Sequence, residues 1–558
     1  MTRTLTALAL ALAAGTCSAQ NTITVPDDVP TLSLALNPAV SGLAAGDTIV
    51  LRDTVAYAGT FTINTPDITI REAAGDDVVV DAFGTGAAFT VDAAGGSVTF
   101  EGLTIQNGAN PGSNGAAINV LASGGLIARD CIFRDNTAQA GGAIYSTVSS
   151  TVLENCSFSG NSTTMFGGAI RTAGTPSQSV TITGCTFTDN HALGGNGGAI
   201  DHAGSGAALN ISGTLFSMNT CATNGGAVFC TSSDSVTLDG CDFFDNTAGG
   251  IASEDTGGAF FTSTTGILVR DCDFERNICP GSGGALRFSN STGTLIDNRF
   301  VQNVSSSGGA FQVVGASAAA DVFNCVFDAN SARGEGSDDQ DGGAIICNGD
   351  AFLAVYNSLF VDNTAETGGA IIVRESSDIV VYNSTFAGND ADTFGGAIRR
   401  LDPGSSTNIN SSIFSGNLPT PQQVTIGNVG NTSVNYSLID GGFANINENA
   451  VIDADPMFVD AAGGDYSLMA GSPAIDAGSS TRYVGGPLSD LAGNDRGQDD
   501  PDTADTGEVI IGAVIDMGAY EFNNNSGIPD CPADQNFDGM LSPTDFSAWI
   551  GNYNAGCD

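Results

Sequence analysis

Two short motifs alternate along the middle of this chain at a nearly constant spacing. Phe-x-x-Asn occurs eleven times between residues 133 and 417, and Gly-Gly-Ala followed by an apolar residue occurs ten times in alternation with it. The first and last repeat phenylalanines, Phe133 and Phe414, are 281 residues apart in ten steps, so the mean period is 28.1 residues. Internal repeats of about 20–50 residues are typical of solenoids, in which each coil packs only on its neighbours. The repeat therefore predicts the scaffold, but not its chemistry.

The spacing within one repeat indicates which side chains face the interior. In residues 141–161, the glycines begin a strand and Asn161 ends the segment at a corner. We expect Val152, Cys156 and Phe158 to face inward, because strand positions i and i+2 face the same side. The position two before each repeat phenylalanine therefore accepts only small side chains. This predicts unbridged thiols, with some oxidation between neighbouring coils left open. The occupants are Cys131, Cys156, Cys185, Thr214, Cys241, Cys272, Asn298, Cys325, Ser358, Ser384 and Ser412.

Stacking such coils about 4.8 Å apart places identical side chains above one another. The phenylalanines then form an aromatic column, and the asparagines form a ladder in which each amide offers both a donor and an acceptor. A single buried asparagine would be destabilising, whereas a ladder satisfies every member except those at its ends. Short crossovers between parallel strands also favour one hand. The sequence therefore predicts an all-β protein, a right-handed parallel β-helix.

The regions on either side of the repeat indicate how the rod begins and ends. Residues 29–40 start with a proline and have helical apolar spacing, which predicts a short helix over the first coil. After Asn417 the repeat decays into glycine-rich and acidic turns. The predicted divisions are a signal peptide (1–19), an N-terminal cap (20–45), β-helix repeats (46–420), last coils with a C-terminal cap (421–522), a linker (523–530) and a calcium-binding segment (531–558).

The N-terminus and the charge balance limit the location and the partners. Arg3, the apolar stretch from Leu5 to Ala14 and the small residues 17–19 predict a secretory signal, with Cys17 as an alternative lipoprotein cysteine. We therefore expect a secreted, extracellular or cell-surface protein of a bacterial envelope, with no later membrane span. The chain has 16 basic residues, all arginine, against 61 acidic ones, a net charge of −45. Such a surface repels nucleic acids, anionic membranes and, without bridging calcium, acidic polysaccharides.

The C-terminal segment contains one loop with the ligand pattern of an EF-hand. Residues 534–545 read DQNFDGMLSPTD, with a glycine at the sixth position and a helix-like run after it. Alternating hard oxygen donors suit Ca²⁺ and no soft metal, whereas the alternative is an acidic turn before a helix. The predicted calcium ligands are Asp534, Asn536, Asp538, the carbonyl of Met540, and Asp545, with Ser542 reaching the ion through water.

The motifs resemble those of known bacterial proteins. Across about residues 100–417, the alternating GGA[I/L/V/F] and FxxN motifs resemble the repeats of polymorphic outer membrane proteins and related right-handed β-helix proteins. This resemblance implies a pectate-lyase-like solenoid and an adhesin-like role. The stretches 464–478 (GDYSLMAGSPAIDAG) and 515–522 (IDMGAYEF) resemble the C-terminal ends of bacterial surface β-helix proteins.

The tail resembles a cysteine-flanked dockerin segment with one calcium loop in place of the usual two. The resemblance implies attachment through a cohesin-like or cell-envelope partner, although the missing second loop puts high-affinity cohesin pairing in doubt. A disulfide is expected between the flanking residues Cys531 and Cys557.

Few residues suggest catalysis. Asp242 and Asp273 each lie between a repeat phenylalanine and the cysteine two residues before it, in adjacent coils. Both should therefore point outward and stack about 5 Å apart. That spacing suits a retaining glycosidase, a calcium site or a solvated acidic stripe. His191 and His202 are expected to decorate loops. Three functions remain: a non-catalytic adhesin-like scaffold that binds glycans, a polysaccharide lyase or glycoside hydrolase with a dockerin-like module, and a passive structural layer.

The predicted calcium loop can be tested on the isolated segment 523–558 by titration calorimetry. We expect Ca²⁺ to bind with measurable heat, and Asp545→Ala to weaken binding because it removes the ligand at position 12. Absence of heat in the parent peptide, or unchanged binding in Asp545→Ala, would contradict the assignment.

Overall fold

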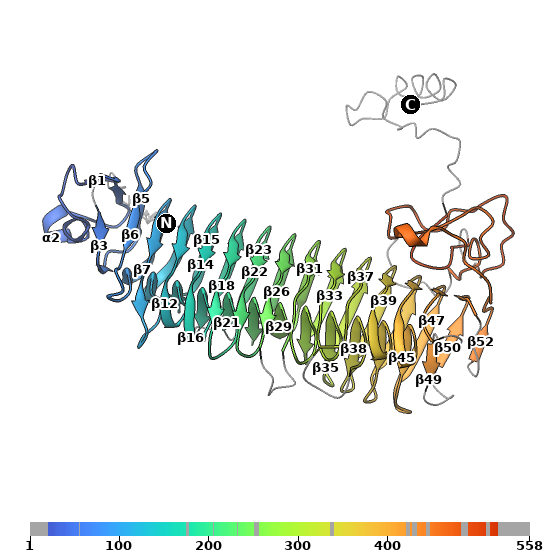
Figure 1. The fold of residues 1–558 in the computed structure, drawn as a ribbon. Coiled ribbons are helices and arrows are strands. Elements are labelled where there is room, and N and C mark those ends of the chain that lie inside the picture. The colour runs from blue at the N-terminus through green and yellow to red at the C-terminus, as the bar shows by residue number, and fades with distance from the viewer. Residues whose placement is uncertain are drawn as a thin grey trace, which may run out of the picture.

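A computed structural model of the chain shows a long solenoid with a small cap at each end (Figure 1). The predicted signal peptide, linker and calcium loop lie outside the described residues, so they stay predictions. The structure describes residues 20–54, 56–173, 178–204, 206–231, 233–249, 256–334, 340–419, 424–426, 432–441, 447–480, 489–508 and 514–522.

Each repeat coil contributes strands to two long parallel sheets, and several coils add a third. One coil contains β13 (Ile144–Ser146), β14 (Ser150–Glu154), β15 (Ser157–Ser159) and β16 (Ser162–Phe166). Within the described residues, β13- and β14-type strands form a 29-stranded sheet, β15-type strands a 15-stranded sheet and β16-type strands a six-stranded sheet. Corresponding residues pair in register between coils, as Phe158 does with Phe187. The predicted right-handed parallel β-helix is confirmed.

The strands of the 15-stranded sheet carry the repeat phenylalanines and position the residues considered below. In order they are β3 (Tyr57–Ala58), β6 (Val79–Asp81), β8 (Thr104–Gln106), β11 (Ile132–Arg134), β15 (Ser157–Ser159), β19 (Thr186–Thr188), β23 (Leu215–Ser217), β27 (Asp242–Phe244), β31 (Asp273–Glu275), β34 (Arg299–Val301), β37 (Val326–Asp328), β40 (Leu359–Val361), β44 (Thr385–Ala387), β48 (Ile413–Ser415) and β51 (Leu438–Ile439).

The eleven repeat phenylalanines form one continuous interior column, as predicted. Successive ring centroids are 4.6–5.0 Å apart and the ring planes are nearly parallel. All eleven side chains are fully buried, so they stabilise the coil stack and are inaccessible to a ligand. The column consists of Phe133, Phe158, Phe187, Phe216, Phe243, Phe274, Phe300, Phe327, Phe360, Phe386 and Phe414.

The repeat asparagines form the predicted ladder of buried amides. Nδ2 of Asn219 donates to the carbonyl of Phe187 in the preceding coil (2.9 Å) and to Oδ1 of Asn246 in the following one (3.0 Å). Oδ1 of Asn219 accepts from both the backbone N–H (3.2 Å) and Nδ2 (2.9 Å) of Asn190. The same pattern recurs from Asn136 to Asn389, so each internal amide is fully used without water.

The small-residue slot also faces inward, as predicted. The six cysteines in the slot are buried and unbridged. The thiols accept hydrogen bonds from backbone N–H groups, as the serine hydroxyls at the same position do. The N–H of Cys156 donates to Sγ of Cys185 (3.4 Å), and the N–H of Ser358 donates to Oγ of Ser384 (3.2 Å). Cysteine therefore acts here as a small interior residue.

The prediction that Val152 faces inward was wrong. The buried residues of β14 are Thr151 and Leu153, and Val152 lies on the outer face. Asn155, between this strand and Cys156, has a φ of 53°. A left-handed residue at the corner shifts the alternation by one, so counting back in twos from Cys156 gives the wrong face.

The N-terminal segment holds two short helices instead of the single predicted one. These are α1 (Leu32–Ala35) and α2 (Pro38–Ser41), because Pro38 cannot continue a helix but can start one. The same segment contains β1 (Thr22–Val25), which pairs in parallel with β2 (Thr48–Leu51). The solenoid sheet therefore begins before residue 45.

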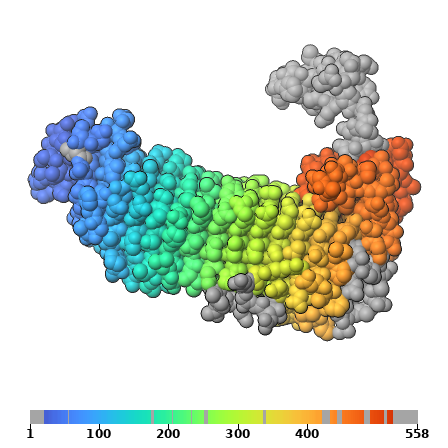
Figure 2. Space-filling model, viewed as in Figure 1, coloured from blue at the N-terminus to red at the C-terminus, as the bar shows by residue number. Residues whose placement is uncertain are grey.

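The C-terminal cap packs against the side of the last coils (Figures 1 and 2). Leu359, Val361 and Ala387, on the outer face of the 15-stranded sheet, are buried in one cluster with Tyr466. Tyr466 belongs to β54 (Asp465–Leu468), which pairs in an antiparallel manner with β53 (Phe458–Asp460). The outer face is apolar at these positions because the cap covers it.

We predict that Asn219→Ala destabilises the protein by about 3–5 kcal/mol. The substitution removes the four hydrogen bonds that the side chain of Asn219 makes, at about 1 kcal/mol each, and leaves the buried N–H of Asn190 without this partner, at about 1–3 kcal/mol. The shift in urea midpoint, followed by circular dichroism, measures the effect.

Asn210→Ala is the matched control. Asn210 lies on the outer face of β22 (Ala208–Ser212), nine residues before Asn219 in the same coil. Its replacement should change the stability by less than about 0.5 kcal/mol. Equal effects of the two substitutions would contradict a structural role for the ladder.

Candidate functional site

Two aspartates and an arginine form a column on the outer face of the 15-stranded sheet. Asp242 of β27 pairs with Asp273 of β31, which pairs with Arg299 of β34. The two aspartates are half-buried and Arg299 is exposed. The predicted stacking of the two aspartates on the outer face is thus confirmed. Burial, and then the charge of Asp273, raise the pKa of Asp242. We call these three residues the Asp–Asp–Arg column.

The other arginines around this column are held in ion pairs. Arg270 lies 2.8 Å from Asp239, and Arg276 lies 2.8 Å from Asp245. Hydrogen bonds to these carboxylates raise the pKa of both guanidinium groups. An arginine that serves as a catalytic base needs a lowered pKa, so Arg270 and Arg276 are poorly suited to that role.

The two histidines have different environments, and the prediction that both decorate loops was wrong for His202. His202 lies in β21 (Ile200–Ala203) and is fully buried, with Nδ1 2.6 Å from Oγ1 of Thr172. Burial lowers its pKa to about 4. Aligning the repeats would have found this, because Thr172 and Cys230 occupy the same interior position in neighbouring coils. His191 lies half-exposed at a corner, 3.2 Å from Asp189.

Asp201 is a buried acid that sequence reasoning did not single out. It lies next to His202 in the chain but on the opposite side of the strand, 2.9 Å from Arg171. Burial raises its pKa to about 7, and the charge of Arg171 opposes that shift. The pair is largely shielded from solvent, so we assign it to the packing of the coil.

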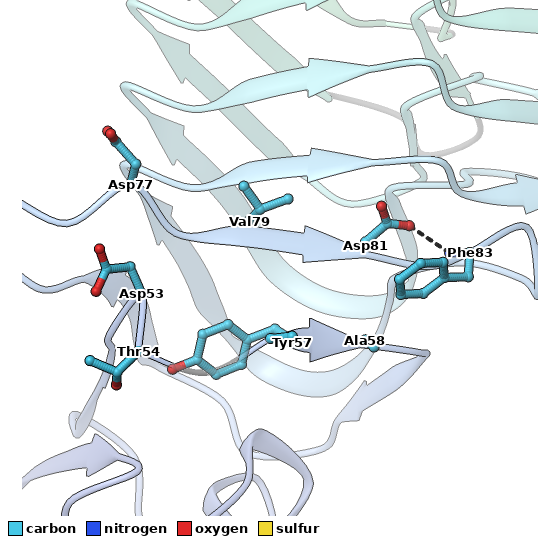
Figure 3. Close-up of a pocket in the computed structure, with 9 residues that line it drawn as sticks. Asp53, Thr54, Tyr57, Ala58, Asp77, Val79, Asp81 and Phe83 are labelled. Atoms are coloured by element: carbon cyan, nitrogen blue, oxygen red, sulfur yellow. Dashed lines mark hydrogen bonds between the residues drawn. The ribbon is translucent and has the colours of Figure 1, made fainter.

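A hollow of about 320 Å³ opens at the N-terminal end of the rod (Figure 3). We call it the N-terminal hollow. Asp53 and Asp77 lie at one end of it, Asp81 and Phe83 at the other, and Tyr57 lies between them. Its lining residues are Asp53, Thr54, Ala56, Tyr57, Ala58, Asp77, Val79, Asp81 and Phe83.

Several hydrogen bonds hold the walls of the N-terminal hollow in place. Asp81 accepts from the side-chain amides of Gln106 (2.7 Å) and Asn107 (2.8 Å), and from the N–H of Phe83 (2.8 Å). The hydroxyl of Tyr57 donates to the carbonyl of Arg52 (2.9 Å). Sequence reasoning missed this site because its residues come from flanking coils that lack the repeat motifs.

The side chain of Phe83 is 67% exposed at the rim of the hollow. Carboxylates that accept hydrogen bonds, combined with aromatic rings, can bind a polar ligand that also has apolar faces.

Comparison with known proteins defines the family. The sequence profile described as "right handed beta helix region" matches residues 58–213 and 175–351, which together span more than half of the chain. The chain belongs to this family. A search of curated proteins found no match. No helix among the described residues is long and apolar enough to cross a membrane.

Solved structures with some similarity include two polysaccharide lyases. Pectate lyase Pel9A is 11% identical with a TM-score of 0.30, over 91% of this chain and 97% of that one. The PL6 family polysaccharide lyase from Pseudopedobacter saltans is 12% identical with a TM-score of 0.25, over 78% of this chain and 94% of that one. Similarity this low carries no functional argument.

We predict that the buried His202 makes the protein less stable in acid. Its folded pKa of about 4 lies below the ordinary value of about 6.5, so the unfolded chain binds more protons between these values. The contribution is present above about pH 6.5, and up to about 3 kcal/mol is lost as the pH falls to about 4.

Urea denaturation of the parent and of His202→Gln between pH 7 and pH 4.5 tests this. The parent should lose more stability on acidification than His202→Gln, because Asp201 and all other acids are common to both proteins. His191→Gln, measured alongside, separates the buried histidine from the exposed one. Equal pH dependence in the parent and His202→Gln would contradict the prediction.

Proposed function

We propose that this protein is a non-catalytic, adhesin-like scaffold, secreted or displayed at the cell surface, that binds a neutral glycan. The ligand site is the N-terminal hollow, and attachment occurs through the C-terminal segment with its calcium loop. The observation that carries the proposal is one hollow that combines three carboxylates with the rings of Tyr57 and Phe83.

The chemistry of the hollow suits a sugar. Sugar hydroxyls donate to carboxylates, and the C–H faces of a sugar ring pack against aromatic side chains. Asp81 is already held by two amides, so it offers a fixed acceptor, whereas Asp53 and Asp77 are exposed. Fixed polar groups reduce the entropy lost on binding.

The charge of the chain favours a neutral glycan over an acidic one. With a net charge of −45 and three aspartates lining the hollow, an anionic saccharide would meet repulsion at long range and at contact. The hollow is lined by residues of β3 and β6, which lie at the end of the rod opposite the C-terminal cap (Figure 1). Attachment through the segment after Phe522 would leave the hollow free to meet its ligand.

The Asp–Asp–Arg column supports a second candidate function, cleavage of a polysaccharide by a lyase or glycoside hydrolase mechanism. Two stacked carboxylates, one with a raised pKa, followed by an exposed guanidinium, provide groups for acid–base chemistry. We rank it second because Arg270 and Arg276, the neighbouring arginines, are held as cations in ion pairs.

Binding and turnover assays separate the two functions. The secreted chain is first screened against immobilised neutral oligosaccharides, and the best ligand is then titrated by calorimetry. We expect Phe83→Ala and the double variant Asp53→Asn/Asp77→Asn each to weaken binding by about tenfold or more. Asp92→Asn, at an exposed site on the nearby strand β7 (Phe89–Glu101), is the control and should bind like the parent.

The same samples are incubated with a polysaccharide panel and assayed for new reducing ends and unsaturated products. The proposal expects no product release. Turnover that is lost in Asp273→Asn would instead establish the second function. Absence of neutral-glycan binding, or binding that Phe83→Ala and Asp53→Asn/Asp77→Asn leave unchanged, would overturn the first.

A further inference from the structure

Three aspartates from two segments of the C-terminal cap lie close together. A carboxylate oxygen of each of Asp476, Asp499 and Asp505 lies within 4.8 Å of those of the other two. Asp476 follows Ile475 in the small apolar core of the cap, whereas the other two are exposed on a later loop. The cluster therefore joins a buried carboxylate to two exposed ones.

The buried member of this cluster has an unsatisfied oxygen. Asp476 is fully buried, and its Oδ1 has no hydrogen-bond partner among the described residues. Its other oxygen, Oδ2, accepts from the N–H of Asp500, at 3.2 Å. A buried carboxylate oxygen without a partner is strongly destabilising, and such groups commonly mark the place of an ion.

Acidic groups also outnumber basic groups around Asp476. The N–H of Asp476 donates to Oδ1 of Asp516 (2.8 Å), a second buried carboxylate. Asp490 and Glu521 are also buried in the cap, and Arg496 forms an ion pair with Glu521 (3.1 Å). With Asp500, whose N–H bonds to Asp476, five of the described residues in this network are buried acids, and one is an arginine.

The carboxylates of Asp476, Asp499 and Asp505 repel one another at these short separations. A cation at this point would relieve the repulsion among the three carboxylates and supply the missing partner of Asp476.

We propose that Asp476, Asp499 and Asp505 bind a Ca²⁺ ion that stabilises the C-terminal cap. All three donors are hard oxygens, and no histidine or cysteine belongs to the cluster, which disfavours zinc and copper. Oxygens on opposite sides of a bound Ca²⁺ are about 4.6–5.2 Å apart, and the separations here fall within that limit. Water and backbone carbonyls complete the coordination shell, as is usual for Ca²⁺.

The position of the site gives the ion a structural role. Asp499 and Asp505 bracket a turn, and the N–H groups of Thr506 and Gly507, which follow it, donate to the carbonyl of Asp476 (2.9 and 3.0 Å). The cap in turn bonds to the coils, where Ala519 donates to Oγ1 of Thr385 (3.0 Å). An ion at Asp476 would therefore hold the exposed loop on the cap core and stabilise the cap over the last coils.

The test uses the full chain with the predicted tail loop inactivated by Asp534→Ala/Asp538→Ala, so that any remaining calcium binding belongs elsewhere. Calorimetry with CaCl₂ should show one site per chain, and the melting temperature should rise by at least about 2 °C at saturating Ca²⁺. Adding Asp499→Asn/Asp505→Asn should weaken binding by about tenfold or more and abolish the thermal shift. These two residues are exposed, so the variant should fold.

Asp502→Asn is the control, because Asp502 is exposed in the same loop and lies outside the cluster, and its replacement also removes negative charge from that loop. It should keep the affinity and the thermal shift. Absence of binding in the tail-inactivated chain would overturn the proposal. So would unchanged affinity in Asp499→Asn/Asp505→Asn, or an equal loss in Asp502→Asn, which would indicate general attraction to an acidic surface. The proposal does not rest on the glycan-binding function, and the outcomes of the two tests are independent.

Discussion

Hydrogen bonding between stacked asparagine amides is the interaction on which the rest of this structure depends. Each Oδ1 accepts two donors from the preceding coil, and each Nδ2 reaches both neighbouring coils. The ladder thereby sets the register in which Phe216 stacks on Phe187 and in which outer residues such as Asp242 and Asp273 meet. Because these amides are saturated, they cannot serve a ligand, and function must lie on outer faces or at the ends.

The asparagine ladder has two ends, and at each end a segment outside the repeat packs against the solenoid. At the N-terminal end, β1 adds a further parallel strand, and helix α1 buries Leu32 and Ala35 beside it. At the other end, the cap packs against the outer side of the last coils. Hydrogen bonds join the two, such as that from Nδ2 of Asn383 to the carbonyl of Asp516 (3.0 Å). Helix α1 thus packs beside the first strand, whereas the C-terminal cap covers part of the outer face of the 15-stranded sheet.

The repeat made the fold predictable, and the breaks in the repeat limited the prediction of the sites. The phenylalanine column, the asparagine ladder and the pairing of Asp242 with Asp273 all follow from a constant period. The inward face of β14 was predicted wrongly because the corner at Asn155 is left-handed, which the alternation rule does not include. His202 could have been placed by aligning it with Thr172. The N-terminal hollow and the aspartate cluster of the cap could not, because non-periodic segments bring their residues together.

The contrast between the middle of the rod and its ends has a physical cause. In the repeat, some outward charges of opposite sign lie on adjacent coils about 5 Å apart, and pairs such as Arg270 with Asp239 neutralise each other there, whereas Asp242 and Asp273 do not. At the ends no periodic partner is available. Asp53 and Asp77 are exposed in the hollow, and Asp476 in the cap has one buried oxygen without a partner among the described residues. Where a solenoid stops repeating, its polar groups become free for a ligand or an ion, and in this protein both proposed sites lie at those places.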